Sequence, residues 1–232
     1  ADIVFGDSNS NIQTLEASIM RAQLTQKMSE TKKLNFSMTS SSFEKMYQNL
    51  YASGYDGTLV TMDGYRDPTE RDNFIVSGNL VNEISTGNMT HTLLMGVEFI
   101  DTENKNLRYD AFWSSTSDDN EVFNITRPMD FSVNSAGLGT GVDFATALNS
   151  QTESDITVSS IYIQDQIDVS DNLKVLLGGR IDDFRITVRD IKNGSSESRN
   201  DNTFSPRAGV VYKPQENVSY YVSYSESFLP RS

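Results

Sequence analysis

The sequence contains no cysteine and a single histidine, His91, and both scarcities exclude classes of chemistry. Without cysteine there is no disulfide framework, thiolate metal site or cysteine nucleophile. One histidine excludes a zinc site built from several histidines and argues against a Ser-His-Asp triad. No paired acid and base or other nucleophile constellation stands out. We therefore expect a protein that is not an enzyme, with no catalytic residues, no metal site and no bound cofactor.

Positive charge and long apolar runs are also scarce. There are 19 Lys and Arg residues against 32 Asp and Glu residues, a net charge of −13, which argues against binding to nucleic acid. No apolar run approaches the roughly 18–20 residues of a transmembrane helix. Apolar residues make up 37% of the chain, but aromatic residues make up 10%, which is too many for a simply disordered chain.

What the sequence does contain is alternation of apolar and polar residues with a period of two, which is typical of β-strands. Apolar residues alternate over 204–212 and again over 218–224, on either side of a turn at 214–217. If Tyr212 faces Tyr220, then Ala208 faces Tyr224 and Phe204 faces Phe228. Every pair is apolar or aromatic and shares one face, as a hairpin requires.

Three more hairpins are predicted by the same pattern, with turns at 29–31, 85–88 and 170–172. The hairpins supply eight strands in total. Much longer links join one hairpin to the next, at about 52–70, 101–155 and 191–202. Short turns at one end and long external loops at the other are typical of an outer-membrane β-barrel.

The two faces of the strands support this interpretation. Phe204 and Tyr212 are eight residues apart, about 26 Å along a strand, or roughly 20 Å along the membrane normal at a tilt of about 40°. That distance approaches the spacing of the aromatic girdles of a membrane barrel. The polar set, which includes Arg180 and Arg207, would then line the lumen, where ion pairs are favoured over binding of an anionic ligand. In a soluble β-sandwich the same residues would form the solvent face.

Five segments resemble TonB-dependent siderophore receptors in order and spacing. They are His91–Phe99, Tyr162–Ile167, Leu177–Asp182, Phe204–Pro214 and Tyr221–Pro230. The fold expected for the whole chain, residues 1–232, is all-β: an antiparallel up-and-down transmembrane β-barrel, present here as about eight consecutive strands of a larger barrel without its plug domain. We expect an internal fragment, since the sequence contains no plug and no TonB box.

The resemblance implies a monomeric receptor of the bacterial outer membrane that imports ferric siderophores. In that family a barrel of about 22 strands encloses a plug, external loops capture the ferric chelate, and the TonB complex acts on the plug to release it. The partners expected are therefore a ferric siderophore or similar chelate, the TonB complex and outer-membrane lipid. Two alternatives remain: a complete small outer-membrane barrel serving as an adhesin or structural protein, and a soluble β-sandwich that binds carbohydrate or protein.

The candidate ligand site lies near the start of the longest link. Arg108, Tyr109, Phe112 and Trp113 occur together there, and Trp113 is the single tryptophan. Aromatic rings with an arginine suit a flat, anionic iron chelate through stacking and cation–π contact. The competing interpretation is that the rings form an aromatic girdle or pack loop against loop. The acidic residues that follow, including Glu121, are expected in a solvated loop.

Four further residues are unusual for their positions. Gly178 and Gly179 precede a change in the parity of the apolar residues, which predicts a β-bulge or a close approach of the plug. Asp165 has the parity of the lipid-facing residues, a cost that a second bulge or an interfacial depth would remove. His91 follows a short turn and is expected to be interfacial and structural.

Overall fold

The computed structural model describes residues 7, 9–125 and 129–228. The described residues form one antiparallel sheet of nine strands. The strands are β1 (Ile12–Lys27), β2 (Lys32–Tyr55), β3 (Leu59–Thr86), β4 (Met89–Phe112), β5 (Glu121–Asn124), β6 (Asp143–Ser170), β7 (Leu173–Asp190), β8 (Ser195–Gln215) and β9 (Val218–Ser225). In this part of the chain no helix has the length and apolarity needed to cross a membrane.

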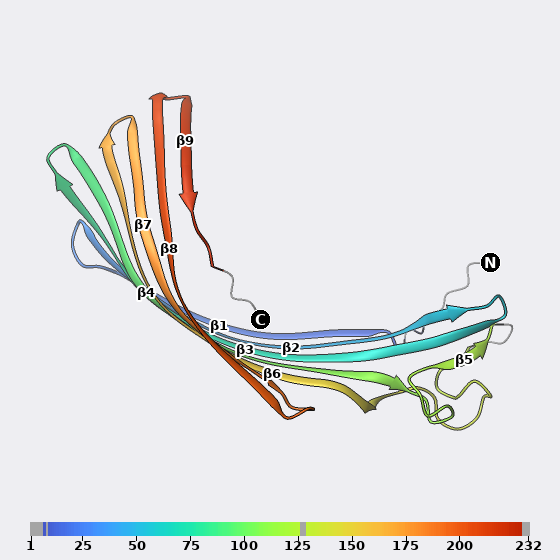
Figure 1. Ribbon diagram of the computed structural model, residues 1–232. Helices are drawn as coiled ribbons and strands as arrows, with labels where there is room; N and C mark the ends of the chain where they lie inside the picture. Colours follow the sequence, from blue (N-terminus) through green and yellow to red (C-terminus); the bar gives the residue numbers. More distant parts are fainter. Residues whose placement is uncertain (1–6, 8, 126–128, 229–232) are drawn as a thin grey trace.

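The sheet is strongly curved and does not close on itself (Figure 1). Its order follows the sequence, β1-β2-β3-β4-β6-β7-β8-β9, while the short β5 pairs with β3 away from this path. The four short turns β1–β2, β3–β4, β6–β7 and β8–β9 gather at the upper left of Figure 1. The β2–β3 turn and β5 lie at the opposite end. This arrangement confirms the predicted fold class of a partial up-and-down barrel.

Matched rows of residues explain why one face of the sheet is apolar and the other polar. Successive residues of a strand point to opposite faces, and paired residues share a face. One row across seven strands is apolar: Leu24, Phe36, Gly78, Val97, Ile161, Ile181 and Phe204. The neighbouring row is polar: Gln23, Ser37, Ser77, Glu98, Ser160, Asp182 and Thr203. We call these two surfaces the apolar face and the polar face.

The predicted hairpin at the C-terminal side is largely confirmed. Tyr212 pairs with Tyr220 and Ala208 pairs with Tyr224. The expected pairing of Phe204 with Phe228 is wrong, because β9 ends at Ser225. Phe228 instead packs against Phe184, with ring centroids 6.5 Å apart. The stretch Leu229–Ser232, which completes the last motif of the resemblance, lies outside the described residues.

The three links expected as long loops differ from the structure. Strands β2 and β3 run into 52–70 from both sides and leave a turn at 56–58, while β7 and β8 leave a turn at 191–194. The link at 101–155 contains the end of β4, all of β5 and the start of β6. The link at 101–155 is rich in Ser, Asp and Asn, so its composition indicated a loop. Backbone pairing between neighbouring strands continues nevertheless.

The bulge expected at Gly178 and Gly179 is also wrong. The pairing of β7 with β6 and with β8 passes through both glycines without a shift in register. The glycines instead allow close approach within the sheet. A Cβ at Gly178 would lie 2.8 Å from the backbone oxygen of Ile163, and one at Gly179 would lie 2.6 Å from the ring of Phe204. The change in parity arises because Phe184 lies on the polar face, two residues beyond Asp182.

Candidate functional site

The four residues predicted as one ligand site are not brought together. Arg108 and Tyr109 are neighbours in β4, so their side chains point to opposite faces of the sheet. Phe112 is half-buried at the end of β4. Trp113 is fully buried and has no surface with which to stack on a ligand. The four residues are therefore divided between the two faces of the sheet and a buried region at the end of β4.

Trp113 belongs to a small hydrophobic core beyond the end of β4. Its ring lies 5.3 Å from that of Phe123, which in turn lies 5.2 Å from that of Phe131. The other buried members of this core are Leu50, Val60, Met62, Ala111 and Phe144. The segment between β4 and β6 thus packs on the β2–β3 hairpin, with β5 extending that hairpin by one strand. For Trp113 this packing matches the competing interpretation from the sequence, in which the rings pack loop against loop.

Glu121 lies in the same core, although we expected it in a solvated loop. Its residue surface is 3% exposed. Ser115 Oγ and the Ser135 backbone N–H donate to its two carboxylate oxygens, each over 2.6 Å. Burial alone would raise the pKa of Glu121, but the hydrogen bonds from Ser115 and Ser135 outweigh it and hold the pKa below its usual value. The Glu121 carboxylate therefore connects β5 to Ser115, which precedes it in the sequence, and to Ser135, which follows it.

Arg108 instead joins a group of tyrosines on the polar face. Its guanidinium lies 4.2 Å from the centroid of the Tyr65 ring, and its Nε lies 3.3 Å from Asp67 Oδ1. The Tyr47 and Tyr51 rings lie 5.8 and 6.2 Å from that of Tyr65. We call Tyr47, Tyr51, Tyr65 and Arg108 the tyrosine–arginine cluster. It lies on the long outer parts of β2, β3 and β4, away from the short turns.

Tyr51 is held in the cluster by a carboxylate. Its hydroxyl donates to Asp63 Oδ2 over 3.0 Å. Burial, together with the hydrogen bond and the negative charge of Asp63, raises the pKa of Tyr51 above its usual value. The hydroxyl therefore stays protonated at neutral pH and presents a fixed ring. No local signal in the sequence marks these tyrosines, because only the registers of β2 with β3 and of β3 with β4 place them near Arg108.

The two other predicted arginines lie on the polar face near the middle of the sheet. Arg180 Nη2 donates to Glu98 Oε1 and to Ser160 Oγ, and its Nε donates to Asp182 Oδ1, all over 2.7 Å. Arg207 Nη1 donates to Gln164 Oε1 over 2.9 Å. These bonds connect β4, β6, β7 and β8, so both arginines cross-link the sheet within the polar face.

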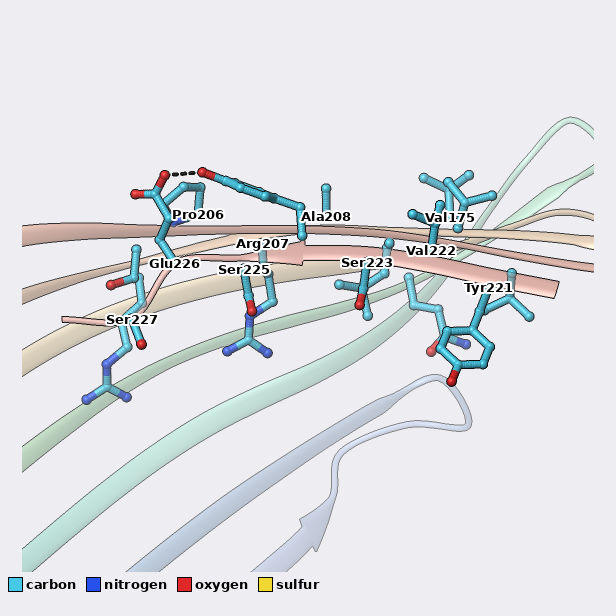
Figure 2. A pocket seen from close by; sticks show the side chains of 18 of the residues that line it. Val175, Pro206, Arg207, Ala208, Tyr221, Val222, Ser223, Ser225, Glu226 and Ser227 are labelled. Atoms are coloured by element: carbon cyan, nitrogen blue, oxygen red, sulfur yellow. Dashed lines mark hydrogen bonds between the residues drawn. The ribbon is translucent and has the colours of Figure 1, made fainter. Parts of the chain in front are cut away.

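A groove of about 740 Å³ lies where β7, β8 and β9 meet (Figure 2). Pro206, Ala208 and Val222 point to one side of the hairpin, whereas Arg207, Ser223 and Ser225 point to the other. The Tyr224 hydroxyl donates to Glu226. Because β9 has a neighbour on one side only in the described sheet, this groove is a feature of the sheet edge. The tyrosine–arginine cluster is the stronger candidate for ligand recognition, since its rings and charge converge on one face.

Comparison with known proteins gives consistent results. The family model for the β-barrel of TonB-dependent receptor-like proteins matches residues 5–232. The chain is 33% identical over 169 residues to the ferrichrome outer membrane transporter/phage receptor of Escherichia coli strain K12, covering 72% of this chain and 21% of that protein. It is 26% identical to the ferrioxamine receptor of Yersinia enterocolitica, covering 97% of this chain and 31% of that protein.

A solved structure agrees in fold. The ferripyoverdine receptor of the outer membrane of Pseudomonas aeruginosa, bound to ferripyoverdine, superposes with a TM-score of 0.77 at 17% identity. The superposition covers all of this chain and 30% of that one. The chain thus spans about a fifth to a third of the length of the relatives that it matches.

Proposed function

The chain belongs to the TonB-dependent receptor family, as part of its β-barrel, and from this premise we propose that it serves a receptor that imports ferric siderophores across the bacterial outer membrane. The observation that carries the proposal is the tyrosine–arginine cluster on the polar face of a sheet whose other face is apolar. The ferrichrome and ferrioxamine receptors among its relatives support a hydroxamate chelate of ferric iron as the substrate class.

In this proposal the apolar face contacts lipid and the polar face lines the barrel lumen. Transmembrane barrels carry an outward apolar band and a polar interior, which matches the alternating rows of this sheet. The strands have up to 28 residues, whereas about 9–11 residues cross a bilayer. Strands β2, β3 and β4 therefore extend far beyond the membrane on the side opposite to the short turns, and they carry the cluster outside the cell.

The chemistry of the cluster suits a ferric chelate. Three tyrosine rings supply flat apolar surface at low conformational cost, and the guanidinium of Arg108, over the face of Tyr65, supplies hydrogen-bond donors for the oxygens of a hydroxamate chelate. No covalent step is needed, because the cluster would recognise and release an intact complex. Release inward, driven by the TonB complex acting on a plug domain, is part of the proposal for the full-length receptor.

Binding of ferrichrome and ferrioxamine B to the purified full-length receptor tests the proposal. Tyr65→Ala and Arg108→Ala should each weaken binding of the ferric chelate by about fivefold or more, since an apolar contact with the ring or a hydrogen bond from the guanidinium contributes about 1 kcal/mol. Tyr109→Ala is the matched comparison, because Tyr109 lies on the opposite face. Unchanged affinity in both cluster variants would contradict the proposal, and a loss confined to Tyr109→Ala would move the site to the other face.

A further inference from the structure

The apolar face carries a groove of about 840 Å³ across β2, β3, β4, β6, β7 and β8. Gly78 forms part of its floor, where an added Cβ would meet no heavy atom within 4 Å. Three large apolar side chains line the groove with more than half of their surface exposed: Val97, Ile161 and Phe204. Val97 pairs with Gly78 on one side and with Ile161 on the other. The groove is thus a long apolar depression on the face that the proposed function directs toward lipid.

A polar pair lies beside the end of this groove that is nearer the short turns. His91 Nδ1 lies 2.8 Å from Asp165 Oδ2, and the two side chains are 23% and 27% exposed. Asp165 is two residues beyond Ile163, which lines the groove, so about 7 Å of strand separates them. The register of β4 with β6 is continuous here, which excludes the bulge considered for Asp165. Asp165 therefore points out of the apolar face, as its parity requires.

Asp165 retains capacity to accept hydrogen bonds. An ionised carboxylate has about four lone-pair sites, and His91 occupies one of them. The second oxygen, Oδ1, is buried and has no hydrogen-bond partner among the described residues, so a further donor from outside would reach the carboxylate at Oδ2, beside His91. Lys174, on the neighbouring strand β7, is paired with Asp168 on the polar face. A carboxylate in apolar surroundings is stabilised by a cationic donor, and none of the described lysine and arginine side chains forms an ion pair with Asp165.

We propose that this surface binds one phospholipid with an ammonium headgroup, phosphatidylethanolamine, in a fixed place. One acyl chain lies in the groove over Gly78, and the ammonium group donates to Asp165. The order of the two features fits a lipid of the leaflet nearest the short turns, because the polar pair lies at the membrane surface and the groove leads toward the bilayer centre. The inference rests on the membrane location proposed above, and it assigns a role to the lipid-facing carboxylate.

Native mass spectrometry of the full-length receptor in detergent tests this inference. The receptor is titrated with phosphatidylethanolamine and, separately, with phosphatidylglycerol, which lacks the ammonium group. We expect one phosphatidylethanolamine to bind at least about tenfold more tightly than phosphatidylglycerol, which corresponds to ~1.4 kcal/mol. Asp165→Asn should remove this preference, and Gly78→Leu, which fills the groove, should weaken binding of both lipids.

Ala22→Leu is the matched control for Gly78→Leu, because Ala22 is an exposed small residue that does not line the groove. It should bind lipid like the wild type. Equal binding of the two lipids by the wild type, or wild-type binding by Asp165→Asn and Gly78→Leu, would overturn the inference. Ferric chelate binding, measured on the same samples, should not change in these variants, so failure of the lipid site is distinguishable from failure of the proposed import function.

Discussion

At the scale of single residues, neighbours in the sequence proved a poor guide to neighbours in space. The segment 108–113 offered an arginine and three aromatic residues, but strand alternation separates Arg108 from Tyr109, and Trp113 is fully buried. Arg108 contacts Tyr65 and Asp67, which lie more than 40 residues away in the sequence, and the rings of Tyr47 and Tyr51 pack against that of Tyr65. Only pairing between strands creates this site, so residue types alone could not predict it.

The buried carboxylate of Glu121 also depends on residues that are not its neighbours in the sequence, and it contributes to stability. Glu121→Gln should lower the free energy of local opening of β5 by about 1–3 kcal/mol, because the amide cannot replace a carboxylate that accepts hydrogen bonds from both Ser115 and Ser135. Hydrogen exchange of the β5 amides measures this change. Asp119→Asn is the control, since it removes the same charge at an exposed position of the same segment. Equal protection in the wild type and Glu121→Gln would show that the carboxylate does not fix the segment.

The same carboxylate gives the segment a defined pH dependence. Folding lowers the pKa of Glu121, so its ionised form stabilises the segment fully above the ordinary carboxyl value of 4.5. That stability is lost as the pH falls below this value toward the folded pKa. Protection of β5 should therefore decrease on acidification in the wild type, and it should change much less in Glu121→Gln. A loss of protection that begins above neutral pH would contradict this assignment.

At the scale of elements, the sequence predicts strands best where the two faces of the sheet are proposed to meet different media, lipid on one side and water on the other. Alternation identified all four short-turn hairpins, because apolar and polar residues must take opposite faces there. Alternation fades in the outer parts of the strands, where both faces are proposed to meet water, and those parts were predicted as loops. Their backbone pairing depends on neighbouring strands that a local pattern does not reveal.

Gly178 tests the close approach of β6 and β7. Gly178→Ala should destabilise the full-length receptor by about 1–3 kcal/mol, because its Cβ would meet the backbone oxygen of Ile163 at 2.8 Å and force the strands apart. The midpoint of urea unfolding in detergent micelles measures the change. Gly78→Ala is the matched control in the same sheet, since its Cβ would enter open space. Equal midpoints for the two variants would refute the explanation given for Gly178.

At the scale of the whole molecule, one curved sheet with two chemically distinct faces accounts for the charge, the composition and the family. A sandwich would bury its apolar face against a second sheet, and the described residues contain a single sheet. The apolar face instead leaves large side chains such as Ile161, Ile181 and Phe204 more than half exposed. Such a surface is unfavourable in water and stable against lipid. The proposed membrane location therefore accounts for the exposed apolar face.

Spin-label accessibility along β4 tests this account most directly. The chain has no cysteine, so single cysteines at residues 94, 95, 97, 98 and 99 can be labelled in a full-length receptor freed of any other cysteine and reconstituted in bilayers. Gly96 is left unchanged, because a side chain there would overlap Tyr162. The account predicts that labels at 95, 97 and 99 collide with oxygen dissolved in lipid. Labels at 94 and 98 should instead favour a water-soluble relaxant or be shielded from both. Equal exposure to water at all five positions would contradict a membrane barrel.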